Sequence, residues 1–393
     1  MRDKDGIIQI TASKDKVTKK LLELMGKLHQ EDVVAVKGKV VKNKQAPEGI
    51  EIIPSEINVI NKSKVLLPLD PRRVAKSNLD TQLDWRFLYF RTDKAKAIFK
   101  IQSQISKSFR EFFSNRNYLE IQPPILISSA SEGGAELFQL PYFEREAFLA
   151  QSPQLYKQMC AIAFEKVFMI VPCFRAEKFD QPTHLNEIRQ MDIEQAFTND
   201  EDIMKVLEEC LVYILKQVKK NCENELKILK TDLEIPKLPF KRISYMQAIN
   251  LLKKHKEEIS WGEDFSKTQE KKISKLVGNT FFIKDWPTKI KAFYAMPHEK
   301  NLEICKAFDL IHNGIEIASG TQRIHIPELL IKQLKEKGLN PERFKSYIEC
   351  FRYGAPYHSG WSIGLERITM TITNRANIRE VTMFPRDRSR ITP

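Results

Sequence analysis

The stretch Phe174-Arg175-Ala176-Glu177 decides the fold of this 393-residue chain more than any other segment. It follows an apolar run over residues 167–171, which predicts a buried strand. Because side chains alternate along a strand, Arg175 and Glu177 are expected on one face. A polar loop over residues 178–187 comes next, so the charged pair should lie near the turn of a hairpin.

The second strand of this hairpin, residues 190–194, is predicted to have one acidic face. Asp192 and Glu194 alternate there with Met191 and Ile193, so the two carboxylates should point away from the apolar pair. Burying unpaired charge is unfavourable, and an acidic sheet face therefore indicates a ligand or a cationic partner.

A second hairpin is predicted around Asn313-Gly314, the strongest short turn signal in the chain. A two-residue turn pairs position 311 with 316 and position 309 with 318. Asp309 and Glu316 then become diagonal neighbours on one face, roughly 7 Å apart. Mg²⁺ held by a few carboxylates and by substrate phosphates suits this arrangement, and two solvated carboxylates are the alternative.

The formal net charge of +13 is unusual for a globular protein. A nucleic-acid partner is the leading interpretation, and a general lysine bias is the alternative. The six cysteines lack zinc or C-x-x-C spacing, which predicts reduced thiols. The sequence has no apolar leader and no run of membrane-spanning length. We therefore expect a soluble cytoplasmic protein with no membrane partner.

The N-terminal part of the chain combines strand-like runs with one helical run. The strands are expected at residues 6–10, 33–41 and 51–60, and the helix at 16–28. Three strands cannot close a barrel, so residues 1–66 are predicted to form a partial OB-fold β-barrel. Residues 67–92 are predicted to be a hinge.

The remaining residues, 93–393, are predicted to form one large α+β domain. A long amphipathic helix is expected over residues 93–115, followed by a strand over 118–122. Residues 199–300, approximately, read as a helical insertion in which we find no sign of catalytic chemistry.

In this order, the segments resemble the motifs of the class II aminoacyl-tRNA synthetases. The helix and strand within 98–124 resemble motif 1, which forms the homodimer interface in that family. Residues 174–177 resemble motif 2, and Gly364-Leu365-Glu366-Arg367 resembles motif 3. Residues 316–325 narrow the resemblance to aspartyl-tRNA synthetases of the archaeal and eukaryotic type. It implies an antiparallel sheet flanked by helices and preceded by an anticodon-binding OB-fold.

ATP is one substrate that this resemblance implies. Arg175 would hold the α-phosphate, Glu177 would lie near the adenine or the acceptor end of tRNA, and His184 would reach the terminal phosphate. Arg367 would stack on the adenine, and Gly364 would let the nucleotide approach the backbone.

L-Aspartate is the other small substrate implied. Its side-chain carboxylate would meet Lys157 and Arg323, because a guanidinium fork suits a carboxylate and not an amide. Asparagine would leave both cations partly unpaired, at a cost on the order of several kcal/mol. Ser362 stands where relatives carry glycine, and we expect it to alter ATP affinity. The other residues implied to hold aspartate are Glu132, Gln154, Asp192 and Ser319.

The resemblance also implies a mechanism without a general base. The α-carboxylate of aspartate is ionised at neutral pH and can attack the α-phosphate directly. Asp309 and Glu316 match the family's metal-binding acids, so Mg²⁺ is the implied cofactor, and Glu316 also serves the ATP site. Catalysis would rest on positioning and on charge neutralisation by Arg175, Arg367 and Mg²⁺. The aspartyl-adenylate would pass its acyl group to the terminal ribose of tRNA.

Three alternatives stay open. An asparaginyl-tRNA synthetase shares the class motifs, although Lys157 counts against it. A tRNA-independent paralogue that amidates aspartate would keep the adenylation site. A non-catalytic nucleic-acid-binding module would not need Arg175 or Glu316, yet both are present.

The N-terminal residues are expected to recognise tRNA. Gln9 matches a family residue that reads the anticodon. Its aromatic companion would lie upstream of Met1. Either the natural chain begins earlier, which we expect, or anticodon recognition is weakened. Pro47 resembles the pattern of relaxed enzymes. The predicted partners are tRNA-Asp and, if the enzyme is relaxed, tRNA-Asn as well.

Overall fold

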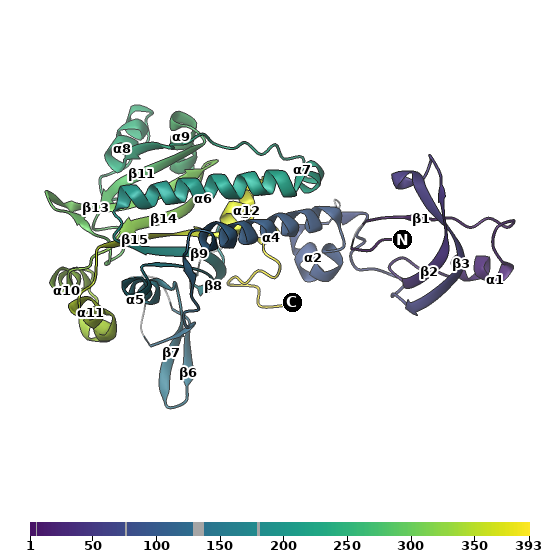
Figure 1. The fold of residues 1–393 in the computed structure, drawn as a ribbon, viewed down its shortest axis with the longest axis horizontal. Helices are drawn as coiled ribbons and strands as arrows, with labels where there is room; N and C mark the ends of the chain where they lie inside the picture. Colours follow the sequence, from purple (N-terminus) through teal and green to yellow (C-terminus); the bar gives the residue numbers. More distant parts are fainter. Residues whose placement is uncertain (5, 75–76, 129–136, 179–180) are drawn as a thin grey trace. The chain divides into compact units, whose positions relative to one another are not determined.

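The computed structural model describes residues 1–4, 6–74, 77–128, 137–178 and 181–393. They divide into an N-terminal unit, Met1–Asp70, and a C-terminal unit, Pro71–Pro393 (Figure 1). None of the helices in these ranges is both long and apolar enough to cross a membrane.

Within its described residues, the N-terminal unit has a three-stranded sheet in the order β1-β3-β2. β1 runs parallel to β3, and β2 runs antiparallel to it. The first strand is shorter than predicted, because Ile7 instead forms an isolated bridge with Arg2. The elements are β1 (Gln9–Ile10), α1 (Lys19–Gly26), β2 (Val33–Lys42), the 3₁₀ turn η1 (Pro47–Gly49) and β3 (Ile50–Asn61).

In the described part of the C-terminal unit, a nine-stranded sheet has the order β10-β11-β13-β14-β15-β9-β8-β4, with β12 beside β13. The predicted antiparallel pairing holds except at the two ends, where β10–β11 and β4–β8 are parallel. The strands are β4 (Leu119–Glu120), β8 (Lys166–Phe174), β9 (Glu187–Ala196), β10 (Lys241–Ser244), β11 (Thr280–Pro287), β12 (Pro297–His298), β13 (Asn301–His312), β14 (Ile315–Gln322) and β15 (His358–Gly364).

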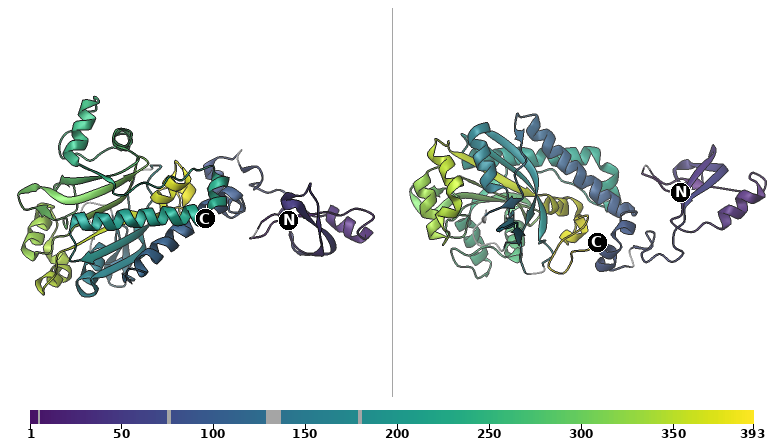
Figure 2. Two further views of the ribbon diagram at one scale, coloured as in Figure 1. Left: turned by 45° about the horizontal axis from the view of Figure 1, so that its top comes forward. Right: turned by 90° about the horizontal axis from the view of Figure 1, so that it is seen from below.

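Three helices cover one face of this sheet: α4 (Asp93–Ser114), α6 (Asp200–Asn221) and α12 (Leu365–Thr373) (Figures 1 and 2). α4 begins where the Thr92 hydroxyl accepts a hydrogen bond from the Ala95 N–H at 3.1 Å. Its apolar side chains recur at helical spacing and are buried against the sheet. The helix predicted over residues 93–115 is therefore confirmed.

Other helices lie around this core. α2 and α3 fall within the predicted hinge, where Arg86 is buried and donates to the carbonyls of Arg379 and Met383 at 3.0 and 2.8 Å. The helices are α2 (Leu79–Asp84), α3 (Arg86–Tyr89), α5 (Gln154–Phe164), α7 (Glu223–Leu229), α8 (Tyr245–Lys254), α9 (Lys267–Val277), α10 (Pro327–Glu336) and α11 (Lys345–Arg352), with 3₁₀ turns η3 (Pro341–Phe344) and η4 (Ile378–Val381).

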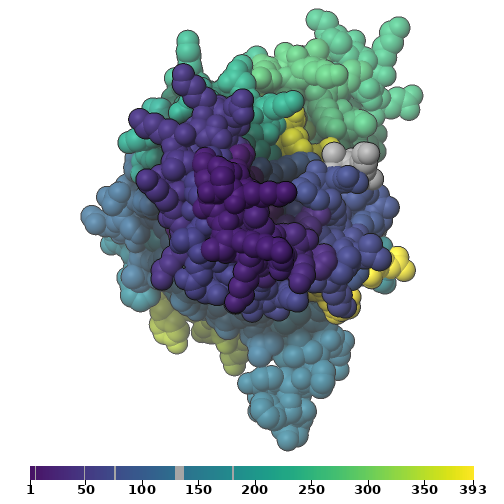
Figure 3. Space-filling model, turned by 90° about the vertical axis from the view of Figure 1, so that its right-hand side faces the viewer, coloured from purple at the N-terminus to yellow at the C-terminus, as the bar shows by residue number. Residues whose placement is uncertain are grey.

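A small separate sheet was not predicted. It contains β5 (Leu126–Ile127), β7 (Arg145–Leu149) and β6 (Gln139–Tyr142), in the order β5-β7-β6. The β6–β7 hairpin projects from the C-terminal unit (Figures 1 and 3). The strand predicted over residues 118–122 is only the two-residue β4.

The β8–β9 hairpin has the predicted two faces. Met191 and Ile193 lie in the core beneath the three helices. Asp192 and Glu194 are also buried, but on the opposite face. The sheet thus separates an apolar layer from a charged one.

The β13–β14 hairpin departs from the predicted register. Ile311 pairs with Glu316 as expected, but Asp309 pairs with Ser319 and not with residue 318. A β-bulge inserts one extra residue after the turn, which shifts every later pair by one position. The predicted pairing of 309 with 318 is therefore wrong.

Candidate active site

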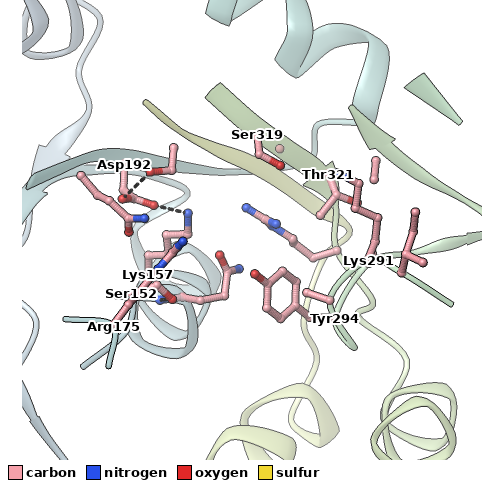
Figure 4. A pocket seen from close by; sticks show the side chains of 17 residues that line it. Ser152, Lys157, Arg175, Asp192, Lys291, Tyr294, Ser319 and Thr321 are labelled. Carbon is pink, nitrogen blue, oxygen red and sulfur yellow. Dashed lines mark hydrogen bonds and ion pairs between the residues drawn. The ribbon is translucent and has the colours of Figure 1, made fainter. Parts of the chain in front are cut away.

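Two adjoining pockets lie on the charged face of the sheet. The larger, of about 230 Å³, holds predicted aspartate-binding residues (Figure 4), and the smaller, of about 120 Å³, holds predicted ATP-binding residues. The larger pocket contains Gln154, Lys157, Arg175, Asp192, Ser319 and Arg323. The smaller contains Arg175, Glu177, His184, Glu316, Ser319, Gly364 and Arg367. Arg175 and Ser319 therefore stand in the wall that the pockets share.

The remaining predicted site residues lie elsewhere. Asp309 is on β13 next to this wall, where it pairs with Ser319. Gln9 and Pro47 belong to the N-terminal unit. Glu132 lies outside the described residues.

Helix α5 presents polar side chains to the larger pocket from one face. Gln154, Lys157 and Gln158 follow the i, i+3, i+4 spacing of neighbours on a helix surface, and all are buried. The Gln154 amide donates to Gln158 Oε1 at 2.7 Å, and the Tyr347 hydroxyl donates to the same oxygen at 2.8 Å. These bonds hold the helix face rigid behind the pocket.

Lys157 reaches from this helix to the two acids of β9. Its Nζ lies 2.6 Å from Asp192 Oδ1 and 3.5 Å from Glu194 Oε2. Figure 4 shows the lysine pointing at Asp192. Only 1% of the Lys157 side chain is exposed, so this ammonium is held in a dry environment.

Arg323 is held by Glu194, a residue to which sequence reasoning gave no role. The Arg323 Nε and Nη2 donate to the two Glu194 oxygens at 2.9 and 3.2 Å. Burial raises the pKa of Glu194, but the charges of Arg323 and Lys157 outweigh it and keep the pKa below its usual value. The acidic alternation of this strand was the signal that could have identified Glu194.

Gly360 on β15 makes room for this ion pair. A Cβ at this position would lie 2.1 Å from Glu194 Oε2 and 2.3 Å from the Ile193 carbonyl oxygen. Any side chain there would push the carboxylate away from Arg323. The glycine upstream of motif 3 therefore serves the buried pair on the neighbouring strand.

Ser362 lines both pockets and also contacts an acid of the larger one. It faces Asp192 across the β15–β9 register, and its hydroxyl donates to Asp192 Oδ2 at 3.1 Å. Lys157 occupies the other Asp192 oxygen. Ser362 thus orients the Asp192 carboxylate in the wall that the pockets share. The sequence suggested only an effect of Ser362 on ATP affinity.

The smaller pocket has a cationic rim. Arg367 donates to the carbonyl of Glu316 at 3.1 Å and to its Oε2 at 3.4 Å. Burial, followed by the charges of Arg367, Lys267 and Arg175, lowers the pKa of His184 to about 4. His184 is therefore neutral at physiological pH and would offer a phosphate a hydrogen bond without a charge.

Glu366 of motif 3 is a structural anchor. It is buried, and both of its oxygens accept the Arg189 backbone N–H at 3.1 Å. Desolvation raises the pKa of Glu366 to about 7. The contact fastens α12, which carries Arg367, to the start of β9.

Asp309 and Glu316 have the chemistry of a magnesium site. Asp309 Oδ1 is buried and has no hydrogen-bond partner among the described residues. Desolvation raises the pKa of Asp309 to about 6, while nearby Lys291 opposes the shift and Glu316 adds to it. The described residues contain no group of three or more His, Cys, Asp or Glu side chains suited to a metal. Two hard oxygen donors instead fit Mg²⁺ that is also bound by substrate phosphates.

The helical insertion contributes charge to this site, contrary to expectation. Lys291 Nζ lies 2.6 Å from Asp309 Oδ2. Lys267, the first residue of α9, lies 4.0 Å from Glu316 Oε2. Neither lysine belongs to a recognisable motif, so only the folded chain reveals them.

In the N-terminal unit, Gln9 is oriented by an acidic residue. Its amide donates to Glu51 Oε2 at 3.1 Å and to the Thr11 hydroxyl at 3.0 Å. Hydrogen bonds from Thr11, Asn43 and Gln9 hold the pKa of Glu51 below its usual value. Pro47 begins the turn η1 between β2 and β3.

Two family models match the chain. Residues 78–388 match the class II tRNA synthetases of the D, K and N group. Residues 1–60 match the OB-fold nucleic acid binding domain.

Named relatives align over the whole chain. The aspartate–tRNA(Asp/Asn) ligase of Methanocaldococcus jannaschii is 49% identical over 100% of this chain and 90% of its own length. The enzyme of the same name from Methanopyrus kandleri is 47% identical over 100% of this chain and 91% of its own length.

Solved structures have the same fold. The asparaginyl-tRNA synthetase of Pyrococcus horikoshii, complexed with asparaginyl-adenylate, superposes with a TM-score of 0.96 at 33% identity, over 100% of this chain and 91% of that one. The aspartyl-tRNA synthetase of Entamoeba histolytica gives 0.87 at 32% identity, over 98% and 84%. This chain therefore belongs to the class II aminoacyl-tRNA synthetases, in the group of the aspartate, lysine and asparagine enzymes.

Proposed function

We propose that the protein activates L-aspartate with ATP and transfers it to tRNA-Asp and tRNA-Asn. The observation that carries this proposal is the pairing of two buried cations, Lys157 and Arg323, in a pocket that adjoins the nucleotide pocket. The names of the relatives support it, because both describe ligases of aspartate to the two tRNAs.

Aspartate selection would follow from the hydrogen-bond donors of the larger pocket, because its charges are already balanced. Asp192 and Glu194 already balance Lys157 and Arg323, so the pocket can be dry without being unstable. Glu194 engages Arg323 Nε and Nη2, and Nη1 remains for the substrate carboxylate. Both oxygens of a carboxylate accept hydrogen bonds, whereas the NH2 group of an asparagine side chain would face one of these donors with another donor, which a buried site penalises strongly.

Adenylate formation would take place at the shared wall. Arg175 lines both pockets, so it can neutralise the α-phosphate where the aspartate α-carboxylate approaches it. The carboxylate oxygen forms the bond to phosphorus, and pyrophosphate leaves with the electron pair of the broken bond. When bound at Asp309 and Glu316, Mg²⁺ would supply further neutralisation of the phosphates.

Transfer to tRNA would use the same pocket and the N-terminal unit. The terminal ribose hydroxyl of tRNA attacks the activated carbonyl and releases AMP. The N-terminal unit would bind the anticodon with Gln9 and Pro47, and the net charge of +13 favours this partner. The six cysteines form no disulfide, and this fits work in the reducing cytoplasm.

Asparagine activation is the second candidate. A solved asparaginyl enzyme superposes with a TM-score of 0.96, so the fold does not distinguish the two amino acids. The buried Lys157–Arg323 pair favours the carboxylate, and the closely matching ligases act on aspartate by name.

Pyrophosphate exchange with aspartate or asparagine, followed by charging of tRNA-Asp and tRNA-Asn transcripts, tests the proposal. We expect exchange with aspartate and comparable charging of both tRNAs. Exchange with asparagine alone would overturn the amino-acid assignment. Charging of tRNA-Asp alone would leave activation intact and refute the relaxed specificity.

A homodimer through α4 and β4 is part of the proposal. β4 is the last strand of the sheet, and its Leu119 is 46% exposed. An apolar side chain on an open strand edge suits a second copy of the chain. Sedimentation equilibrium should give twice the chain mass of 45.8 kDa, and Leu119→Arg should shift the equilibrium toward monomers. A monomeric wild type would refute the dimer.

A further inference from the structure

Lys291 makes two contacts that together are unusual for a lysine. Its Nζ lies 2.6 Å from Asp309 Oδ2 and 3.9 Å from the centroid of the Trp286 ring. The ammonium is therefore held between a carboxylate and an aromatic face.

A metal ion bound to Asp309 would compete with this ammonium for the same carboxylate. Lys291 occupies one oxygen of Asp309, and the other oxygen is buried without a partner among the described residues. Across from it, Glu316 faces Arg367 at 3.4 Å and Lys267 at 4.0 Å. Side-chain cations thus neutralise the same two carboxylates that Mg²⁺ would bind.

We propose that Lys291 is a placeholder cation, whose ammonium neutralises Asp309 in the metal-free enzyme and leaves that carboxylate when Mg²⁺ binds. The inference rests on the proposed function, because it requires Asp309 to be a metal ligand. A second cation directly on that carboxylate would repel the metal.

The surroundings give the displaced ammonium somewhere to go. The Trp286 ring offers a cation–π partner that does not depend on Asp309. Lys291 also lines the larger pocket (Figure 4), where anionic groups of the substrates would lie. Displacement therefore exchanges partners without stranding a buried charge.

One consequence is weak metal binding in the absence of nucleotide. The metal must first break the 2.6 Å ion pair, so only the small fraction of molecules with Asp309 released can bind it. ATP supplies phosphate ligands that make this exchange favourable. Lys291 would thus couple metal binding to the presence of ATP.

The test is the affinity of the full chain for Mn²⁺ at pH 8 without nucleotide, measured by electron paramagnetic resonance. Lys291→Met should lower the Kd on the order of tenfold or more, because the metal no longer competes with an ammonium. Lys291→Gln should act in the same direction. Lys291→Arg keeps the charge and should stay near the wild-type Kd.

Lys267→Met is the matched control from the same insertion. Lys267 is 4.0 Å from Glu316 and is held by Glu270 at 2.8 and 3.0 Å, so it need not move for the metal. Its removal should change the Kd by less than about threefold. If Lys267→Met and Lys291→Met changed the Kd for Mn²⁺ equally, the effect would come from the loss of positive charge near the site. That result would overturn the inference.

Asp309→Asn separates this inference from the proposed function. If it leaves Mn²⁺ binding unchanged, the metal site is wrong and the placeholder falls with it. A second outcome is that Asp309→Asn weakens Mn²⁺ binding while Lys291→Met and Lys291→Gln keep the wild-type Kd. In that case Asp309 is a metal ligand, and only the proposed role of Lys291 is refuted. Thermal melting of each variant confirms that it is folded.

Discussion

The two pockets handle charge in opposite ways. In the larger, the paired side chains of Lys157, Glu194 and Arg323 are at most 4% exposed. In the smaller, Arg367 and Glu316 are 21% and 28% exposed. Buried pairs reorganise only when another partner replaces the one that is lost, whereas partly exposed charges exchange partners at little cost. The larger pocket therefore holds its charges in fixed pairs, whereas the charges at the rim of the smaller pocket can change partners.

Removing the buried acid should break this contrast most severely. Glu194→Gln keeps the shape but leaves Arg323 without its carboxylate and Lys157 with Asp192 alone, so the free energy of unfolding should fall by about 3–5 kcal/mol. Urea denaturation measures the change. Glu187→Gln, on the same strand, removes an acid whose 2.9 Å pair with Arg189 is partly exposed, and should cost only about 0–1 kcal/mol. Equal losses of unfolding free energy in the two variants would show that the buried pair contributes no more to stability than the exposed one.

Removing the buried lysine should act mainly on substrate choice. Lys157→Met deletes the ammonium between Asp192 and the substrate carboxylate, and kcat/KM for aspartate in pyrophosphate exchange should drop by the equivalent of about 2–5 kcal/mol. Discrimination against asparagine should shrink at the same time. Lys332→Met, at a side chain 58% exposed, should have no effect. Retention of wild-type discrimination by Lys157→Met would refute the role of this lysine.

Acid should affect the two pockets in different pH ranges. The pKa of His184 is about 4 in the fold against 6.5 as its ordinary value, so the unfolded chain binds the proton first. Stability should therefore fall as pH decreases from about 6.5 to 4. The pKa of Glu194 is depressed, so its contribution is lost only below its usual pKa of about 4.5.

Unfolding free energies measured against pH check this separation. His184→Asn should flatten the curve between pH 6.5 and 4 and leave the more acidic limb unchanged. Glu194→Gln should do the reverse. A His184→Asn curve parallel to the wild type would contradict the neutral state assigned to this histidine.

The smallest effect is expected at the wall between the pockets. Ser362→Ala removes one hydrogen bond to Asp192 Oδ2, while Lys157 still holds the other oxygen. KM for aspartate should rise by the equivalent of about 0.5–1.5 kcal/mol, and KM for ATP should change less. A larger change for ATP than for aspartate would restore the original expectation for Ser362.

Much of the architecture was predictable because it depends on local pattern. The helix over residues 93–115 and the two faces of the β8–β9 hairpin follow from apolar periodicity, and both are confirmed. The shifted register of Asp309 was not predictable, since a β-bulge depends on how β13 and β14 pack with their neighbours. The roles of individual site residues in binding and catalysis stay predictions.

The sequence by itself determined the class of protein, the order of its motifs and a set of charged and polar residues that line the two pockets, because these depend on short segments with fixed spacing. Only the tertiary structure decided which charges meet. Glu194 pairs with Arg323 from 129 residues away, and Lys291 reaches Asp309 from the insertion. Such pairs depend on the distance between elements after folding, which is independent of their separation along the chain.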